Sequence, residues 1–261
     1  HFYWKRSSDQ VLFSTRLHRW ESDFRPHLMQ LISYAQVPQQ NDQIDVWPCL
    51  GNAELASVLW RNSGKIGMST RSLRGVDAYD ADQDGFLRAH GAWALNYKTT
   101  AYNYMPIFVD IPKKLDESGN EVRQSKMKTL WFASEVERDL ALTLLVGKWG
   151  FLWWVMFGDD FDLTGGLLSS FPVDLSLLDE SVVSELCELS RSLRESMKAN
   201  PTVKKNKGMI YNWHIPSCRD VTDKCDLVWA RVFGAEKLMP ELQTEYFKTM
   251  RTSQGDDEIE E

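Results

Sequence analysis

Residues 134–157 have the sequence SEVERDLALTLLVGKWGFLWWVMF, in which a short charged turn leads into a long apolar run. Ser134 followed three residues later by Glu137 is a capping box, a pair of side chains that bonds the first backbone N–H groups of a helix. From Val136 to Phe157 apolar residues cover every side of a helix instead of one stripe, which is typical of a helix buried in a core. The pattern therefore predicts one long buried helix over 136–157, with its tryptophans in the core rather than stacked on bases: Trp149, Trp153 and Trp154.

Short aromatic and β-branched segments precede this helix, between about residues 64 and 132. Residues 93–97 and 107–111 are two of them, and turn residues bound each one, as is typical of strands. Glu117-Ser118-Gly119-Asn120 is a turn signal, so we expect residues 106–111 and 126–132 to pair as a hairpin. The predicted fold class is α+β, with a β-rich middle segment packed on the long buried helix and a C-terminal helical part.

Apolar residues at spacings of three and four predict helices on both sides of this centre. They cover residues 15–36, 53–61, 179–198, 220–234 and 240–250. A basic segment over residues 202–208 is predicted to be a linker between the helix over 179–198 and the last two helices. The predicted domains are an α+β domain over 1–175, a helical C-terminal part over 176–252 and an acidic disordered tail over 253–261.

The composition is typical of a globular chain, with 43% hydrophobic and 26% charged residues among 261. No apolar run reaches the roughly 18 residues that a membrane span needs, so no membrane partner is expected. The chain begins at His1 instead of Met, which predicts an excised piece or a processed product. The cysteines are never spaced as Cys-x-x-Cys, which favours a reducing, cytoplasmic compartment over a disulfide framework; they are Cys49, Cys187, Cys218 and Cys225.

The net charge of −7 is unevenly distributed along the chain. Five acidic residues lie in the tail, and without them the remaining chain has a net charge of −2. Basic clusters therefore remain possible on a near-neutral body. They occur at 113–114, 123–128 and 204–207, and solvated loop charges are the alternative interpretation of each.

Motifs that mark common catalytic or nucleotide-binding sites are missing from the sequence, including Gly-x-Ser-x-Gly, the P-loop, His-Glu-x-x-His and Gly-x-Gly-x-x-Gly. The five histidines have no metal-ligand spacing, so no catalytic residue and no metal ligand is predicted. His214 beside Trp213 is expected to be a packed or capping residue. Residues 80–85, DADQDG, match the opening of a calcium-binding loop, but Gly91 stands where that loop needs a bidentate Glu. A plain acidic surface turn is the favoured interpretation, and calcium binding there is left open.

Two later groups of segments resemble a known family. The stretch 131–139 leads the apolar helix, which ends with Phe151-Leu152-Trp153-Trp154, and the segments 159–164 and 169–173 follow it. This order resembles the target-recognition region of N6-adenine DNA methyltransferases of restriction–modification and phage-defence systems, in the type IIG class. Tyr211-Asn212-Trp213 and residues 218–226 resemble the start of that family's closing helix. The resemblance is close over residues 125–250 and loose over 1–125.

The family's catalytic Asn-Pro-Pro-[Phe/Tyr] loop and its glycine-rich S-adenosylmethionine loop are both missing here. The resemblance thus implies a sequence-specific DNA-recognition module of an adenine-specific DNA methyltransferase, non-catalytic on its own. Its implied partners are double-stranded DNA and the methyltransferase domain of the parent protein. No cofactor is expected in this fragment, and S-adenosylmethionine is expected in the missing catalytic domain. The alternative is a protein-interaction or scaffold domain without DNA contact, which suits the near-neutral body, the acidic tail and the many aromatic residues.

Side chains suited to DNA contact fall in three groups on this interpretation. The first lies among turn glycines and offers short donors and Arg forks that can bind guanine in the major groove. The second is a polar, aromatic loop of the same kind. The third is a lysine trio for phosphates or for the missing domain. The candidates are Lys65, Ser69, Arg71 and Arg74, then Asn96, Lys98, Tyr102 and Asn103, then Lys204, Lys205 and Lys207.

Overall fold

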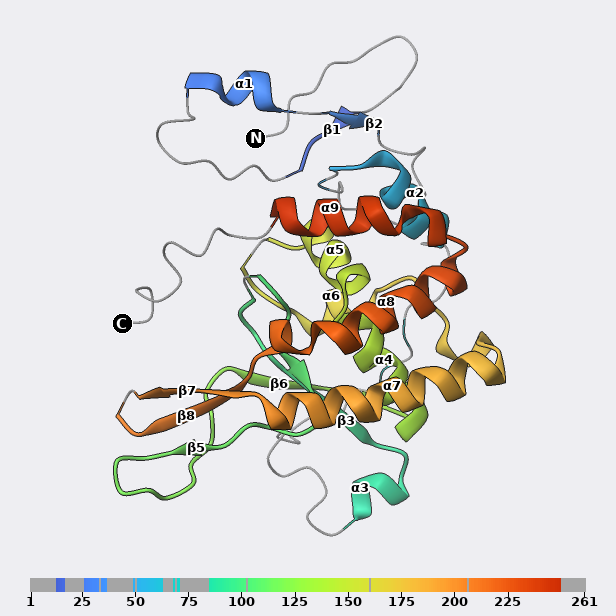
Figure 1. Ribbon diagram of the computed structural model, residues 1–261. Helices are drawn as coiled ribbons and strands as arrows, with labels where there is room; N and C mark the ends of the chain where they lie inside the picture. Colours follow the sequence, from blue (N-terminus) through green and yellow to red (C-terminus); the bar gives the residue numbers. More distant parts are fainter. Residues whose placement is uncertain are drawn as a thin grey trace.

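Two consecutive buried helices form the centre of the fold, which is seen in a computed structural model (Figure 1). Helix α4 covers Glu135–Leu145 and helix α5 covers Lys148–Phe157. Most of their residues are buried, as the apolar run predicts. The structure describes residues 13–16, 26–32, 34–36, 49, 51–62, 68, 70, 85–101, 103–159, 161–205 and 207–249.

The prediction of one helix over 136–157 is wrong, because α4 and α5 meet at an angle of 72°. The break falls at Gly147, whose backbone is extended, with φ −81° and ψ −179°. Gly150 allows the two helices to approach closely, because a Cβ there would lie 2.5 Å from the carbonyl oxygen of Leu145. The predicted cap at Ser134 is confirmed: the Glu137 N–H donates to Ser134 Oγ at 3.1 Å, and Glu137 Oε2 accepts from the backbone N–H of Ala133, one residue before the cap, at 3.1 Å.

A three-stranded antiparallel sheet precedes α4 in the chain. It consists of β4 (Ile107–Phe108), β3 (Trp93–Lys98) and β6 (Met127–Phe132), in that order. The predicted hairpin between 106–111 and 126–132 is wrong, because both segments pair with β3, on its opposite sides. β3 pairs with β6 along six residues, from Trp93↔Phe132 to Lys98↔Met127, so cross-strand contacts with a segment outside the predicted hairpin hold β6 in place.

A second antiparallel sheet joins the middle of the chain to its C-terminal part. Its order is β5 (Lys114–Leu115), β8 (Met209–Trp213) and β7 (Pro201–Lys205). The predicted linker over 202–208 is therefore wrong, because β7 and β8 form a hairpin. Lys207 and Gly208 have positive φ values of 43° and 121°, which is typical of tight hairpin turns. In Figure 1 this hairpin extends to the left beyond the helices, beside β5.

The N-terminal part differs from its prediction. In place of a helix over 15–36, the described residues contain a short antiparallel pair, β1 (Phe13–Ser14) with β2 (Ala35–Gln36), and a four-residue helix, α1 (Leu28–Leu31). Ala35 is buried in the core, so tertiary packing outweighs the local helical pattern. The helix predicted over 53–61 is confirmed as α2 (Ala53–Asn62). Helix α3 is a single turn, Phe86–Ala89.

The C-terminal helices agree with their predictions. They are α7 (Glu180–Ala199), α8 (Arg219–Phe233) and α9 (Met239–Thr249). Short elements connect them: α6 (Gly165–Ser169), η2 (Leu175–Leu177), η3 (Ile215–Cys218) and η4 (Glu236–Leu238). Among the described residues no single helix has the length and apolarity of a membrane span, although α4 and α5 taken together as a bent pair do. Helices and antiparallel sheets together confirm the α+β class, with its helical C-terminal part.

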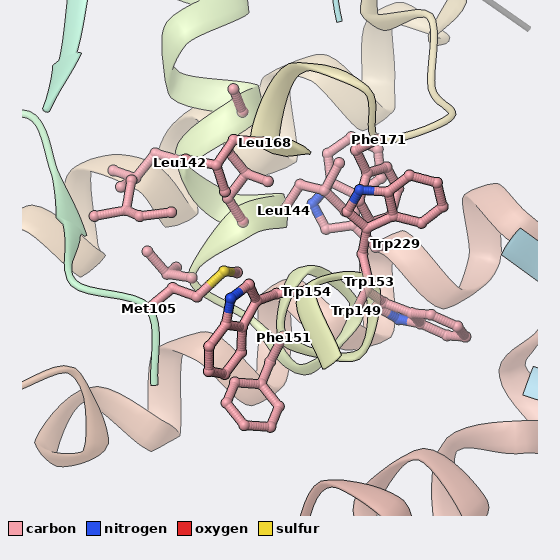
Figure 2. Packing of buried hydrophobic residues seen from close by; sticks show 14 of the residues in the cluster. Met105, Leu142, Leu144, Trp149, Phe151, Trp153, Trp154, Leu168, Phe171 and Trp229 are labelled. Carbon is pink, nitrogen blue, oxygen red and sulfur yellow. The ribbon is translucent and has the colours of Figure 1, made fainter. Parts of the chain in front are cut away.

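One hydrophobic cluster unites these elements. Figure 2 shows its centre, where side chains of α5 meet Trp229 of α8 and Phe171 of the α6–η2 loop. The predicted core tryptophans are confirmed, because Trp149, Trp153 and Trp154 are all buried. The cluster contains residues on both sides of position 175. The boundary predicted there stays a prediction about folding units, although the core is continuous across it.

Candidate nucleic-acid interface

The β7–β8 hairpin carries the third group of predicted DNA contacts. We call residues 201–213 the arm. Lys204 and Lys205 lie in β7 and Lys207 lies in the turn, and all three side chains are exposed. Every residue of β7 is exposed. The structure therefore brings this lysine trio together on a two-stranded ribbon.

The strand register shows on which face of the arm each lysine lies. Lys204 pairs with Ile210, which pairs with Lys114 of β5 on its other side. Residues in register lie on one face of a sheet, and two strand spacings separate Lys204 from Lys114, about 10 Å. Lys205 pairs with Met209 and lies on the opposite face, because side chains alternate along a strand. Lysines are thus present on both faces of the arm.

β7 is an edge strand of its sheet, since no strand of the described residues pairs with its outer side. Edge lysines can have a purely protective role, because they keep an exposed strand from pairing with other chains. Val203 and Met209, on the same face as Lys205, are 47% and 37% exposed. The face of the arm that carries Lys205 is therefore basic and also exposes two apolar side chains, Val203 and Met209.

The base of the arm is fixed by the second group of predicted contacts. Lys98 Nζ donates a hydrogen bond to Asn212 Oδ1, so β3 and β8 are tied together. The ring of Tyr104 meets the ring of His214 edge-on, with centroids 5.9 Å apart. The backbone oxygen of Asn103 accepts a hydrogen bond from the Tyr246 hydroxyl at 3.2 Å. The loop after β3 thus lies between the arm and α9, and sequence reasoning missed Asn212 as its contact on the arm.

Asn96 does not have the role predicted for it. Its side chain is 3% exposed, its Nδ2 donates to the Val109 carbonyl at 2.8 Å, and its Oδ1 accepts from the Thr129 hydroxyl at 2.9 Å. A DNA base could reach neither atom without breaking the sheet. Asn96 is a structural residue that satisfies polar groups between β3, β6 and the end of β4.

The remaining candidates lie outside the described residues and stay predictions: Lys65, Ser69, Arg71, Arg74 and Tyr102. Residues 80–84 of the possible calcium loop do so as well. Within the described part of the chain, no three His, Cys, Asp or Glu side chains gather as metal ligands could. All four cysteines are described, and none of them forms a disulfide.

An acidic turn stands next to the basic arm. It follows β5 and contains Asp116, Glu117 and Glu121. Hydrogen bonds from the backbone N–H groups of Asn120 and Ser118, each 2.9 Å long, help to hold the pKa of Asp116 below its usual value, the bond from Asn120 contributing most. Gly208 of the arm contacts this turn, since a Cβ on it would collide with the Leu115 carbonyl. The sheet therefore carries lysines from β7 across to Lys114 of β5, and the acidic turn lies just after β5.

His214 is half-buried and begins η3, as a packed or capping residue would. Its Nδ1 lies 2.6 Å from the hydroxyl of Ser217, three residues on. Burial and the nearby Arg219 lower the pKa of His214. Among the described residues no carboxylate contacts the ring, so the third member of a Ser–His–acid triad is missing. The pair belongs to the local turn.

A small cavity near this turn is lined by Val146, Gly147, Lys148, Ile215, Pro216, Arg219, Thr222 and Tyr246. Its volume of about 20 Å³ has room for a water molecule. Small-molecule sites have volumes of about 300 Å³ or more. This cavity is therefore too small for a substrate.

Comparison with known proteins gives no relative from which function could be inferred: no family model, no curated protein and no solved structure matches this chain.

Proposed function

We propose that the chain binds double-stranded DNA through the arm. The observation that carries the proposal is the exposed trio Lys204, Lys205 and Lys207 on a two-stranded ribbon at the edge of a sheet. The major groove of B-DNA admits a two-stranded β-ribbon. Lysines on both faces of such a ribbon can contact phosphates on both sides of the groove. The cytoplasmic location predicted from the cysteines belongs to the same proposal.

The lysines provide affinity rather than sequence preference. A lysine on a phosphate displaces condensed counterions, so the logarithm of the binding constant falls with the logarithm of the salt concentration by about 0.9 per contact. Base edges would be read by shorter polar side chains. Thr202 is exposed on the same face as Lys204, and its hydroxyl, which donates to the Asn212 carbonyl at 3.5 Å, would have to turn from that long bond to a base edge to take this role.

The acidic turn limits the direction from which DNA can approach. It lies beyond β8 from β7, so about 10 Å of sheet separates the two edges. At physiological salt the Debye length is about 8 Å, which screens most of the repulsion between a phosphate at β7 and the turn. The DNA therefore approaches the β7 edge and not the β5 side.

The association with an adenine-specific methyltransferase is a further part of the proposal, and the sequence resemblance is its only support. On this view the chain is a non-catalytic recognition module, and S-adenosylmethionine binds to another domain of the parent protein. Base flipping by that domain requires a second unit that holds the duplex, and the arm supplies the contacts for such a unit.

Duplex binding of matched charge variants tests the proposal. Lys204→Gln/Lys205→Gln changes the arm, and Lys224→Gln/Lys237→Gln makes the same charge change at exposed positions in α8 and η4. We expect fluorescence anisotropy with random-sequence duplexes to show roughly tenfold weaker binding for the arm variant and a salt slope smaller by about 2. The control variant should bind as the unchanged chain does. Equal losses in the two variants, or no binding to any duplex at low ionic strength, would contradict the proposal.

A protein partner is the second candidate, and the open edge of β7 favours it. An extended peptide can add to such an edge as a further strand. Val203 and Met209 would then contact apolar side chains of the peptide, with Lys205 beside them. This candidate predicts that duplexes do not bind and that Val203→Asp abolishes peptide binding.

A further inference from the structure

We infer that the chain carries its own competitor for the arm: the acidic segment 256–261, Asp256-Asp257-Glu258-Ile259-Glu260-Glu261, adds to the edge of β7 as a strand. The inference rests on the proposed function only where it concerns competition with DNA. The docking itself involves the arm and the segment alone. The segment lies outside the described residues, and the surface that would receive it is described in full at β7.

Charge complementarity identifies the occupant. Five of the six residues in 256–261 are acidic, and three of the four residues in 204–207 are lysines. The acidic turn after β5 cannot act as this competitor. The hydrogen bonds of Asp116 fix the shape of the turn, and β8 separates the turn from the edge of β7. Opposite charges placed directly across paired strands stabilise the pairing.

The side-chain pattern of the segment matches β7 as well as its charge does. In an extended strand Ile259 shares a face with Asp257 and Glu261, since side chains alternate. Val203 and Lys205 share a face of β7 in the same way. Placing Ile259 opposite the 47%-exposed Val203 sets an acidic residue opposite Lys205 and another opposite Lys204. This match holds for either strand direction.

The last described helix ends on the side of the molecule where the arm extends. Helix α9 ends at Thr249, and Tyr246 near its end bonds to Asn103, in the loop whose Tyr104 contacts His214 at the base of the arm. In Figure 1 α9 ends on the left of the molecule, the side on which the arm extends. Residues 250–255 can span roughly 20 Å when extended, and a five-residue strand is about 16 Å long. This length, together with the contact between α9 and the loop at the base of the arm, directs the acidic residues toward β7.

Docking of the segment would make DNA binding conditional. The same lysines cannot serve phosphates and carboxylates at once, and a tethered segment acts at an effective concentration in the millimolar range. The arm without the docked segment is then the minor form if the segment binds with a dissociation constant below that concentration.

Hydrogen exchange of the full chain tests the docking without DNA. The neutral-tail variant replaces Asp256 and Asp257 by Asn and Glu258, Glu260 and Glu261 by Gln. We expect the amides of β7 to exchange faster in this variant than in the unchanged chain. Ile259→Pro, which keeps all five charges but breaks a strand, should have the same effect, whereas Ile259→Val should not. Equal exchange at β7 in all four chains would overturn the inference, and protection that disappears on dilution would assign the occupant to a second copy and overturn it as well.

Duplex affinity of the same chains separates the two proposals. The neutral-tail variant should bind DNA roughly tenfold more tightly at low salt. If β7 is protected by the segment but no duplex binds to any variant, docking stands and DNA binding fails. If duplexes bind through the lysines and the tail changes neither exchange nor affinity, DNA binding stands and docking fails.

Discussion

Asp226 of α8 caps helix α5 and neutralises its only lysine. Its Oδ1 accepts the backbone N–H of Lys148 at 2.9 Å, and its Oδ2 lies 3.2 Å from the ammonium of the same residue. The Asp226 carbonyl also accepts a hydrogen bond from the Trp149 indole at 3.1 Å. The Gly147 cap has no side chain, so this carboxylate replaces a local N-cap residue. Lys148 can therefore lie inside an apolar run because its partner is supplied by a helix 78 residues further on.

Removal of this carboxylate should destabilise the fold. Asp226→Ala takes away the cap and leaves Lys148 buried with Asp223, whose side chain is 49% exposed, as its remaining partner. Removing one partner of a buried ion pair costs about 3 kcal/mol. We expect a loss of this size in the free energy of unfolding measured with urea. Asp223→Ala is the matched control and should cost less than about 1 kcal/mol. A larger loss for Asp223→Ala than for Asp226→Ala would contradict this account.

The same carboxyl should make stability depend on pH. Burial raises the pKa of Asp226 to about 6, against the opposing effect of Lys148. Burial alone would lower the pKa of Lys148, but Asp226 and Asp223 outweigh it and raise that pKa. Both groups are thus charged at neutral pH, and Asp226 is the one that takes up a proton on mild acidification.

The sign follows from proton uptake. Between about pH 4 and pH 6 the folded chain binds a proton at Asp226 that the unfolded chain does not. The contribution of Asp226 to the free energy of unfolding is therefore greatest below pH 4 and is lost as the pH rises through 6. The full difference is about 3 kcal/mol for a shift of about two pKa units. Asp110 and Asp116 have lowered pKa values and titrate below this window. His214, whose pKa is also lowered, contributes with the opposite sign in the upper part of the window, equally in the unchanged chain and in Asp226→Asn. Urea unfolding from about pH 4 to 7 should therefore show a difference in slope between the unchanged chain and Asp226→Asn; parallel curves would contradict the assignment.

Gly147 is required by the same contact. A Cβ at this position would lie 2.3 Å from Asp226 Oδ1, so Gly147→Ala must displace the carboxylate from Lys148. We expect a loss of about 1–3 kcal/mol, the usual cost of overpacking a core. Gly166→Ala is the control, since a Cβ at Gly166 meets nothing within 4 Å, and it should be neutral or slightly stabilising. Thermal unfolding of the two variants gives the comparison, and similar melting temperatures would exclude this role for Gly147.

The sequence contained local signals for the break between α4 and α5 and for the β7–β8 hairpin, although the predictions from apolar periodicity missed both. Two glycines and one lysine interrupt the apolar run at Gly147-Lys148-Trp149-Gly150, and such residues mark a break when they occur inside a helical pattern. Gly208 after a β-branched pair, Thr202-Val203, is a hairpin signal of the same kind. The three lysines between Val203 and Gly208 made residues 202–208 resemble a basic linker.

Other features depend on partners that no local pattern identifies. The register of β5 with β8 joins Lys114 to Ile210, and Lys98 meets Asn212 across a similar separation. Asn96 has the composition of a base-reading residue and becomes structural only because Thr129 and Val109 satisfy its amide. Helix α2, the C-terminal helices and the class of the fold were predictable because they depend on residues near in sequence, whereas the N-terminal strand pair, the bend between α4 and α5 and the surroundings of the lysine trio depend on the tertiary fold.

Neutralising the acidic turn should strengthen DNA binding if the β7 edge is the contact surface. Glu117→Gln/Glu121→Gln removes two exposed charges beyond β8 without changing the lysines. At about 10 Å the repulsion of phosphates is partly screened, so we expect affinity to rise roughly two- to fivefold at low salt and not at all near 1 M salt, where the Debye length is about 3 Å. Glu180→Gln/Glu236→Gln, at exposed positions in α7 and η4, makes the same charge change away from the arm and should have little effect. Anisotropy titrations over a salt series give both values, and a gain that is equal in the two variants, or that persists at high salt, would place the DNA elsewhere on the chain.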